Sequence, residues 1–153
     1  MRLSDRRGGR PAQHGRCSPA VVANNAFGDA PGTVSVINSA TCNGTVTAGC
    51  GRRFPTTATG IAPQLAAVDP ATGTIYVTDF GSAGVTVLDG SRCNATVTSG
   101  CGAPLREQAV GSEPAGLAVS PQTSTVYVVD TFQAGSLSVL ATDPGATPTE
   151  PRF

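Results

Sequence analysis

Apolar residues occur along this chain in short runs separated by turn residues, and no window has the spacing of an amphipathic helix. The clearest run, "TIYVTDF" (74–80), is rich in β-branched and aromatic residues. It follows "QLAAVDP" (64–70) across a turn that contains Gly73, and it precedes "VTVLDG" (85–90). Runs of this kind, bounded by Gly, Pro and Asp, predict short β-strands that follow one another in hairpins.

A fourth, weaker strand is predicted in each unit, near "PTTAT" (55–59) and "REQAV" (106–110). A degraded earlier copy of the pattern spans 21–37, and "LSVL" at 137–140 repeats the third strand once more. The sequence therefore predicts units of up to four antiparallel strands, each unit forming one meander sheet.

The pattern repeats with a period of 51 residues. Residues 34–84 align with 85–135 without a gap, and 23 of the 51 aligned pairs are identical. Four-stranded sheets that recur at this interval are typical of β-propeller blades, which bury their faces against the next blade. A β-solenoid usually has shorter, parallel coils, and a two-sheet sandwich does not explain the recurrence. We therefore expect an all-β fold, a partial β-propeller of four-stranded meander blades.

Composition divides the chain into three parts. Residues 1–19 form an Arg-rich arm without periodicity, which we expect to be disordered, as we do the Pro/Thr-rich tail at 142–153. The blade array is predicted over 20–141, with two full repeats and partial ones. Acidic residues outnumber arginines after the arm, which argues against a nucleic-acid surface on the repeats. No apolar run is long enough to cross a membrane.

Four of the five cysteines form two pairs at equivalent positions of consecutive repeats, Cys42 with Cys50 and Cys93 with Cys101. Glycines beside the second cysteine of each pair allow the chain to turn back, which favours one local disulfide per repeat. A shared four-thiolate zinc site is the alternative, although structural zinc sites usually have closer cysteine spacing. Disulfides predict an oxidising compartment. The role of the fifth cysteine, Cys17, stays open.

Two stretches carry a family resemblance, "PQLAAVDPATGTIYVTDF" and "PAGLAVSPQTSTVYVVDT". They resemble the repeats of bacterial YVTN-type β-propellers, in which a Pro precedes the first strand and a Tyr-Val-Thr-Asn tetrapeptide lies in the second. The corresponding motif residues here are Pro63, Tyr76 and Asp79, and Pro114, Tyr127 and Asp130.

The resemblance implies blade geometry and, for some relatives, a surface or periplasmic location, but no particular ligand. Family members are usually closed rings of about seven blades, whereas this chain holds two full units and parts of two more. We therefore expect a fragment or truncated form of a longer extracytoplasmic protein, although no signal peptide is present in the chain as written. Self-association through exposed terminal blades is the alternative way to complete the array.

Few residues are candidates for chemistry. Asp79 and Asp130 recur once per repeat, so we expect them to accept backbone hydrogen bonds in the turns that follow, and we expect the same of Asp69 and Asp89. Tyr76 and Tyr127 are predicted to pack between blades. The one histidine, His14, lies in the arm, which leaves no catalytic base for a Ser or Cys nucleophile in the repeats. The sequence therefore identifies no catalytic, cofactor-binding or metal-binding residue.

The sequence favours a non-catalytic scaffold or binding module with an unidentified partner. The first alternative is the remnant of a propeller enzyme of the lactonase or dehydrogenase type. The second is a DNA-binding propeller. Asn43 and Asn94 also begin glycosylation sequons, although both fit a purely structural role in the cysteine loops.

Overall fold

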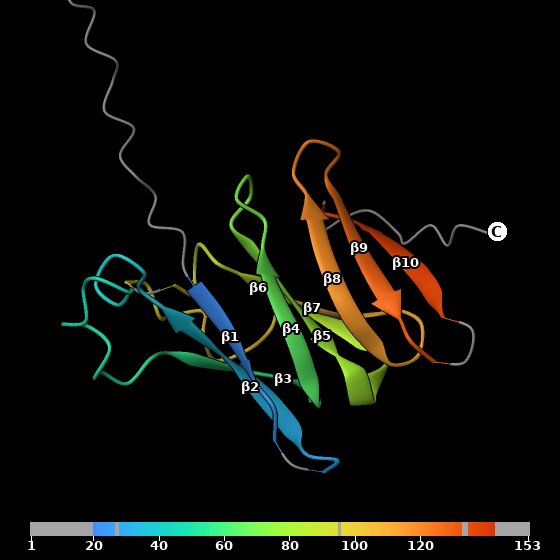
Figure 1. Ribbon diagram of the computed structural model, residues 1–153, viewed down its shortest axis with the longest axis horizontal. Helices are drawn as coiled ribbons and strands as arrows, with labels where there is room; N and C mark the ends of the chain where they lie inside the picture. Colours follow the sequence, from blue (N-terminus) through green and yellow to red (C-terminus); the bar gives the residue numbers. More distant parts are fainter. Residues whose placement is uncertain (1–19, 27, 95, 133–134, 143–153) are drawn as a thin grey trace, which may run out of the picture.

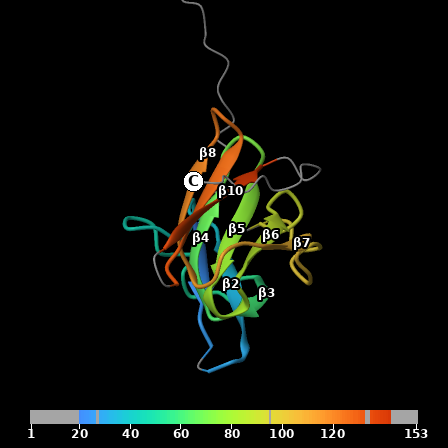
Figure 2. The same ribbon diagram turned by 90° about the vertical axis from the view of Figure 1, so that its right-hand side faces the viewer.

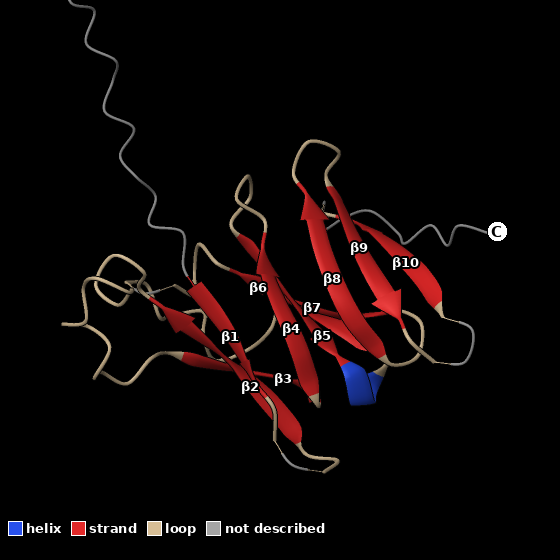
Figure 3. Ribbon diagram, in the orientation of Figure 1, coloured by secondary structure: helices blue, strands red, loops and turns tan. Residues whose placement is uncertain are grey.

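The structure is a computed structural model, and it describes residues 20–26, 28–94, 96–132 and 135–142. Within these residues the chain is built of β-strands, with one short 3-10 turn, η1 (Phe80–Ser82), and no α-helix (Figure 3). The all-β fold predicted from the sequence is confirmed. The arm at 1–19, with His14 and Cys17, and residues 143–153 lie outside the described residues.

The strands form three open antiparallel sheets, in which neighbours in sequence are also neighbours in the sheet (Figure 1). The first sheet consists of β1 (Ala20–Asn24), β2 (Pro31–Ile37) and β3 (Thr56–Ile61). The second sheet consists of β4 (Pro63–Val68), β5 (Thr74–Asp79), β6 (Gly84–Asp89) and β7 (Arg106–Ala109). The third sheet consists of β8 (Pro114–Ser120), β9 (Thr125–Asp130) and β10 (Ser136–Ala141). None of the described sheets closes on itself.

The sheets follow the sequence repeat. β8 and β9 begin 51 residues after β4 and β5, and β10 begins 52 residues after β6 because of the one-residue slip. Strand pairing is equivalent as well, since Tyr76 lies opposite Val87 in the second sheet and Tyr127 lies opposite Val139 in the third. The second sheet has the predicted four-stranded meander. The described part of each neighbouring sheet has three strands.

The first and second sheets are stacked face to face. Val34 and Val36 of β2 belong to the same buried cluster as Ile75 and Val77 of β5 and Leu88 of β6. Period-2 alternation places these side chains on facing surfaces of the two sheets. Full burial of each such aliphatic side chain contributes roughly 1.5–3 kcal/mol, so this cluster is a principal source of stability.

The second and third sheets stack in the same way through a separate cluster. Tyr76 of β5 and two valines of β6 lie against β9 and β10 of the third sheet, and the cluster comprises Tyr76, Val85, Val87, Val126, Val128 and Leu140. The views in Figures 1 and 2 show the third sheet covering one side of the second. The second sheet is therefore buried on both faces, whereas each of its neighbours has one covered face.

The turns recur along with the strands. Ala62 and Glu113 both have positive φ, 52° and 57°, directly before Pro63 and Pro114, which start the first strand of their sheets. The carbonyls of Ala62 and Glu113 accept hydrogen bonds from the backbone N–H groups of residues 80 and 131, at 3.1 and 3.0 Å. The Pro residues are buried at the point where the register shifts at a β-bulge. The backbone conformation around the motif proline is therefore the same in the second and third sheets.

Candidate functional site

The most elaborate surface feature of the chain is a pair of loops that are each closed by a disulfide. Cys42 is bonded to Cys50 and Cys93 to Cys101, with Cα–Cα distances of 4.8 and 4.6 Å. Both predicted disulfides are present, so these four sulfur atoms do not form the alternative zinc site. We call residues 42–50 the first stapled loop and residues 93–101 the second.

One asparagine organises each loop. Asn43 Oδ1 accepts hydrogen bonds from the N–H and hydroxyl of Thr45 and from the N–H of Val46, each at 2.9 Å. Asn94 Oδ1 makes the same three contacts with Thr96 and Val97, at 2.9, 2.9 and 2.8 Å. The two loops therefore share one internal framework as well as one disulfide position.

The side-chain nitrogens of these asparagines are also engaged. Asn43 Nδ2 donates to the carbonyl of Ser39 at 2.8 Å, and Asn94 Nδ2 donates to the carbonyls of Gly90 at 2.9 Å and Ser91 at 3.2 Å. The Asn and Thr residues of the sequons thus support the loop conformation, which is the structural role that the sequence left open for them.

The two disulfides differ in burial. Cys93 and Cys101 belong to the core cluster between the first and second sheets, and Thr57 of β3 donates a hydrogen bond to the Cys101 carbonyl at 2.7 Å. Cys42 and Cys50, at the equivalent places of the first repeat, are only half-buried. The sequence did not indicate this difference, because it depends on the preceding sheet, which covers the second bridge.

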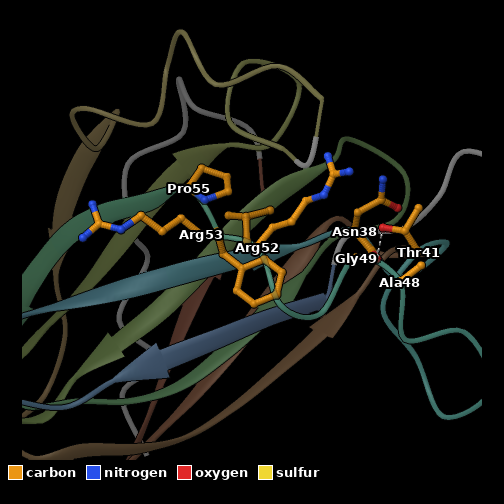
Figure 4. Close-up of a pocket in the computed structure, with 9 residues that line it drawn as sticks. Asn38, Thr41, Ala48, Gly49, Arg52, Arg53 and Pro55 are labelled. Atoms are coloured by element: carbon orange, nitrogen blue, oxygen red, sulfur yellow. Dashed lines mark hydrogen bonds between the residues drawn. The ribbon is translucent and has the colours of Figure 1, made fainter.

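A hollow of about 270 Å³ lies beside the first stapled loop, and nine residues line it: Val36, Asn38, Thr41, Ala48, Gly49, Arg52, Arg53, Phe54 and Pro55. Figure 4 shows the Arg52 side chain directed toward Asn38 and the Arg53 side chain directed away from it. The Gly49 N–H donates to the Thr41 carbonyl at 2.8 Å across the base of the loop. A side chain at Gly49 would collide with Thr41, which explains the glycine.

A second hollow, of about 320 Å³, lies at the equivalent place beside the second stapled loop. Its lining includes Asp89, Arg92, Ala103 and Pro104, whose equivalents one repeat earlier are Asn38, Thr41, Arg52 and Arg53. The framework of the loop is thus retained between repeats, while the polar side chains around the hollow change. Arginines that follow the first loop are replaced by Ala and Pro after the second.

Asp79 lies buried inside the second sheet. Its Oδ2 accepts a hydrogen bond from the Thr86 hydroxyl at 2.5 Å, and the Thr86 oxygen accepts one from the Gly60 N–H at 3.3 Å. Oδ1 is buried without a hydrogen-bond partner. Burial raises the pKa of Asp79 from 3.8 to about 6, although the hydrogen bond from Thr86 acts in the opposite direction.

The same arrangement recurs in the third sheet. Asp130 Oδ2 accepts hydrogen bonds from the hydroxyls of Ser138 at 2.7 Å and Ser136 at 3.3 Å, and the Ser138 oxygen accepts one from the Gly111 N–H at 3.1 Å. In the first sheet the position belongs to Asn24, which donates to the hydroxyl of Ser35 at 2.8 Å. Each described sheet therefore carries one such side-chain pair between its second and third blade strands.

The structure differs from the prediction that Asp79 and Asp130 hydrogen-bond the turns after them. Asp79 makes no side-chain capping bond to η1, and both carboxyls bind hydroxyls on the neighbouring strand. The register opposes each aspartate to the first residue of that strand, which brings the hydroxyl of the third residue, Thr86 or Ser138, within reach. Asp69 and Asp89 do accept backbone N–H bonds in their own turns, from Ala71 and Ser91, both at 2.9 Å.

The two motif tyrosines lie at equivalent places in different surroundings. Tyr76 is 1% exposed between the second and third sheets, and its hydroxyl donates to the Thr142 carbonyl at 3.4 Å. Burial raises the pKa of Tyr76, with a smaller contribution from the charge of Asp69. Tyr127 is 37% exposed on the uncovered face of the third sheet. The predicted packing between sheets is thus observed for Tyr76, whereas Tyr127 is not packed between two of the described sheets.

Groups of side chains suited to metal binding are not found in the part of the chain that the structure describes, where no three His, Cys, Asp or Glu residues gather. No described helix is long and apolar enough to span a membrane.

Comparison with known proteins adds no identity: no protein-family model matches the chain, and no curated protein matches it significantly. The surface features that remain as a candidate site are the two stapled loops and the hollows beside them.

Proposed function

We propose that this chain is a run of β-propeller-type blades that acts as a non-catalytic scaffold or binding module in an oxidising, extracytoplasmic compartment. The stapled loops and their hollows form its variable contact surface. The stacked sheets are the support that holds these loops in fixed positions.

The observation that carries this proposal is a constant framework with a changing lining. The disulfide, the Asn-centred hydrogen bonds and the glycine at the loop base are the same in both stapled loops. The side chains around the hollow differ, since Arg52 and Arg53 correspond to Ala103 and Pro104. Rigid scaffolds that present chemically different loops are typical of binding surfaces.

The blade interpretation is supported by the way in which the sheets stack. Each sheet is a meander, and the second sheet uses one face toward the first sheet and the other face toward the third. Radial stacking of such sheets is the architecture of propellers. The resemblance of the Pro63–Tyr76–Asp79 and Pro114–Tyr127–Asp130 motifs to YVTN-type repeats supports the same interpretation.

The compartment is proposed from the two disulfides, because such bridges persist in oxidising environments and are rare where thiols are kept reduced. A direct test is to produce the chain in the bacterial cytoplasm and, with an added export signal, in the periplasm. We expect both bridges, mapped by non-reducing mass spectrometry, and cooperative unfolding only in the exported protein. A stably folded cytoplasmic product with four free thiols at these positions would contradict the proposed oxidising compartment.

Calorimetry with Ca²⁺ separates the binding module from an enzyme remnant. A propeller enzyme of the lactonase type needs converging oxygen ligands around a metal. We expect no heat of stoichiometric binding with the exported, oxidised chain. Tight binding of one Ca²⁺ per chain would contradict a plain scaffold and would favour the enzyme remnant.

A further inference from the structure

The third sheet exposes one apolar face. Tyr127 and Val129 of β9 and Leu137 of β10 are 37%, 48% and 40% exposed, and Val139 beside them is half-buried. The opposite face of the same strands, with Val126, Val128 and Leu140, is completely covered by the second sheet. Contiguous apolar side chains of this kind on a soluble domain mark a contact surface.

The repeat shows what covers such a face. The equivalents of Tyr127, Leu137 and Val139 in the second sheet are Tyr76, Val85 and Val87, and these three are buried against the third sheet. At the remaining position the buried Thr78 is replaced by the more apolar Val129. The exposed face is thus an uncovered copy of a sheet-to-sheet interface that exists within the same chain.

The first sheet carries the complementary surface. In the interface within the chain, the third sheet contributes Val128 and Leu140 to the contact. Their equivalents in the first sheet are Val22, which is 46% exposed, and Ile37, which is half-buried. Asn24 and Ser35 lie on this face at the places of Asp130 and Ser138. The outer face of the first sheet therefore repeats the side that receives a tyrosine-bearing sheet.

We infer that the chain binds a second copy of itself head to tail, with the outer face of the third sheet stacked on the outer face of the first sheet of the next copy. This inference rests on the blade array proposed above. The contact is heterologous, since two different faces meet. Each dimer therefore leaves one face of each kind free, and further copies add until a ring closes or a filament forms.

The half-buried disulfide agrees with this arrangement. Cys93 and Cys101 are shielded by the sheet that precedes theirs, whereas the first sheet has no described sheet before it. A second copy stacked on the first sheet provides that missing neighbour for Cys42 and Cys50. Association is then expected to slow the reduction of the Cys42–Cys50 bridge.

Sedimentation velocity of the oxidised chain over a micromolar to sub-millimolar series tests the inference. We expect the wild-type chain to associate with increasing concentration. Val129→Glu and Val22→Glu each place a carboxylate in the contact, and each should raise the concentration of half-association at least about tenfold. Leu65→Glu is the matched control, because Leu65 is 46% exposed on β4 of the second sheet, which contributes to neither outer face. Circular dichroism and disulfide mapping confirm that each variant is folded.

A mixture of the two variants gives the sharpest result. Val129→Glu retains an intact first-sheet face and Val22→Glu retains an intact third-sheet face, so the mixture should form 1:1 dimers that do not grow. A wild-type chain that stays monomeric, association that both variants leave unchanged, or a mixture without dimers would each overturn the inference. If the wild-type chain stays monomeric and the Tyr76 side chain is still shielded from solvent, only the association is wrong and the blade array stands. If the Tyr76 side chain of that monomer is exposed to solvent, the blade array is wrong as well.

Discussion

Asp79 is a buried carboxyl that makes the stability of the fold depend on pH. Its carboxyl has one oxygen bound to Thr86 and the other without a partner, and its pKa is raised to about 6. The unfolded chain ionises this group near 3.8, so the folded state binds more protons between these values. The stability of the wild-type chain should therefore fall as the pH rises from about 4 to about 6, and the loss persists at higher pH.

Replacement of this carboxyl by an amide removes the cost of ionisation. Asp79→Asn should increase the free energy of unfolding at pH 7 by an amount on the order of 2 kcal/mol, with little effect below pH 4. Asn24 already forms the equivalent side-chain pair with Ser35, so an amide fits this geometry. Urea unfolding at several pH values measures the effect.

Asp89→Asn serves as the control for that experiment. The hydrogen bond from the Ser91 hydroxyl, at 2.6 Å, holds the pKa of Asp89 below its ordinary value, so this carboxylate stabilises the fold when it is charged. The Asn variant at position 89 should lose stability at neutral pH. A loss of stability at both positions would contradict the assignment for Asp79.

Ser124 has a backbone conformation that suits glycine. Its φ is 50°, and the equivalent residue one repeat earlier is Gly73 with φ 75°. A side chain in this left-handed region costs about 1 kcal/mol. Ser124→Gly should therefore increase the free energy of unfolding by about 0.5–1 kcal/mol and raise the thermal unfolding midpoint slightly. Gly73→Ser is the reverse change, and calorimetry should show a loss there; equal effects in both variants would contradict this interpretation.

At the scale of elements, the strands and the stapled loops follow directly from local sequence. Alternation, turn residues and the spacing of Cys42–Cys50 and Cys93–Cys101 are sufficient to predict the strands and both disulfides. The hydroxyl partners of Asp79 and Asp130 could not be predicted, because they depend on strand register. The burial of Cys93 could not be predicted either, because the residues that cover it belong to another sheet.

The two disulfides should contribute differently to stability. Closing either short loop stabilises the fold by about 2–3 kcal/mol on the chain-entropy model. Cys93→Ala/Cys101→Ala should cost about 1 kcal/mol more than Cys42→Ala/Cys50→Ala, because it also empties space in the core cluster. Urea unfolding of the exported double variants measures this difference.

The accessibility of the bridges provides a second measurement at this scale. Dithiothreitol should reduce Cys42–Cys50 before Cys93–Cys101 in the folded monomer, as mass spectrometry of alkylated peptides would show. Simultaneous reduction of both bridges would argue that the second stapled loop is not covered by the first sheet.

For the whole molecule, sheet stacking decides the surroundings of residues whose local sequences are nearly the same. "TIYVTD" and "TVYVVD" differ at two positions, yet Tyr76 is buried and Tyr127 is exposed. The difference arises from the presence of a following sheet in one case, which no local pattern reports. The stacking of the second sheet on the third and the proposed association of copies therefore use the same kind of contact, in which the face that carries the motif tyrosine meets the opposite face of another sheet.

The most direct test of the stacked-blade architecture is the environment of Tyr76 in solution. The chain contains two tyrosines, which makes their ring signals straightforward to assign. In a nuclear Overhauser experiment on the oxidised Val129→Glu chain, the Tyr76 ring should show cross-peaks to methyl groups of Val126, Val128 or Leu140. The Tyr127 ring of the same chain should show no cross-peaks to methyl groups of the first or second sheet. Absence of every cross-peak from Tyr76 to the third sheet would contradict the stacked-blade architecture.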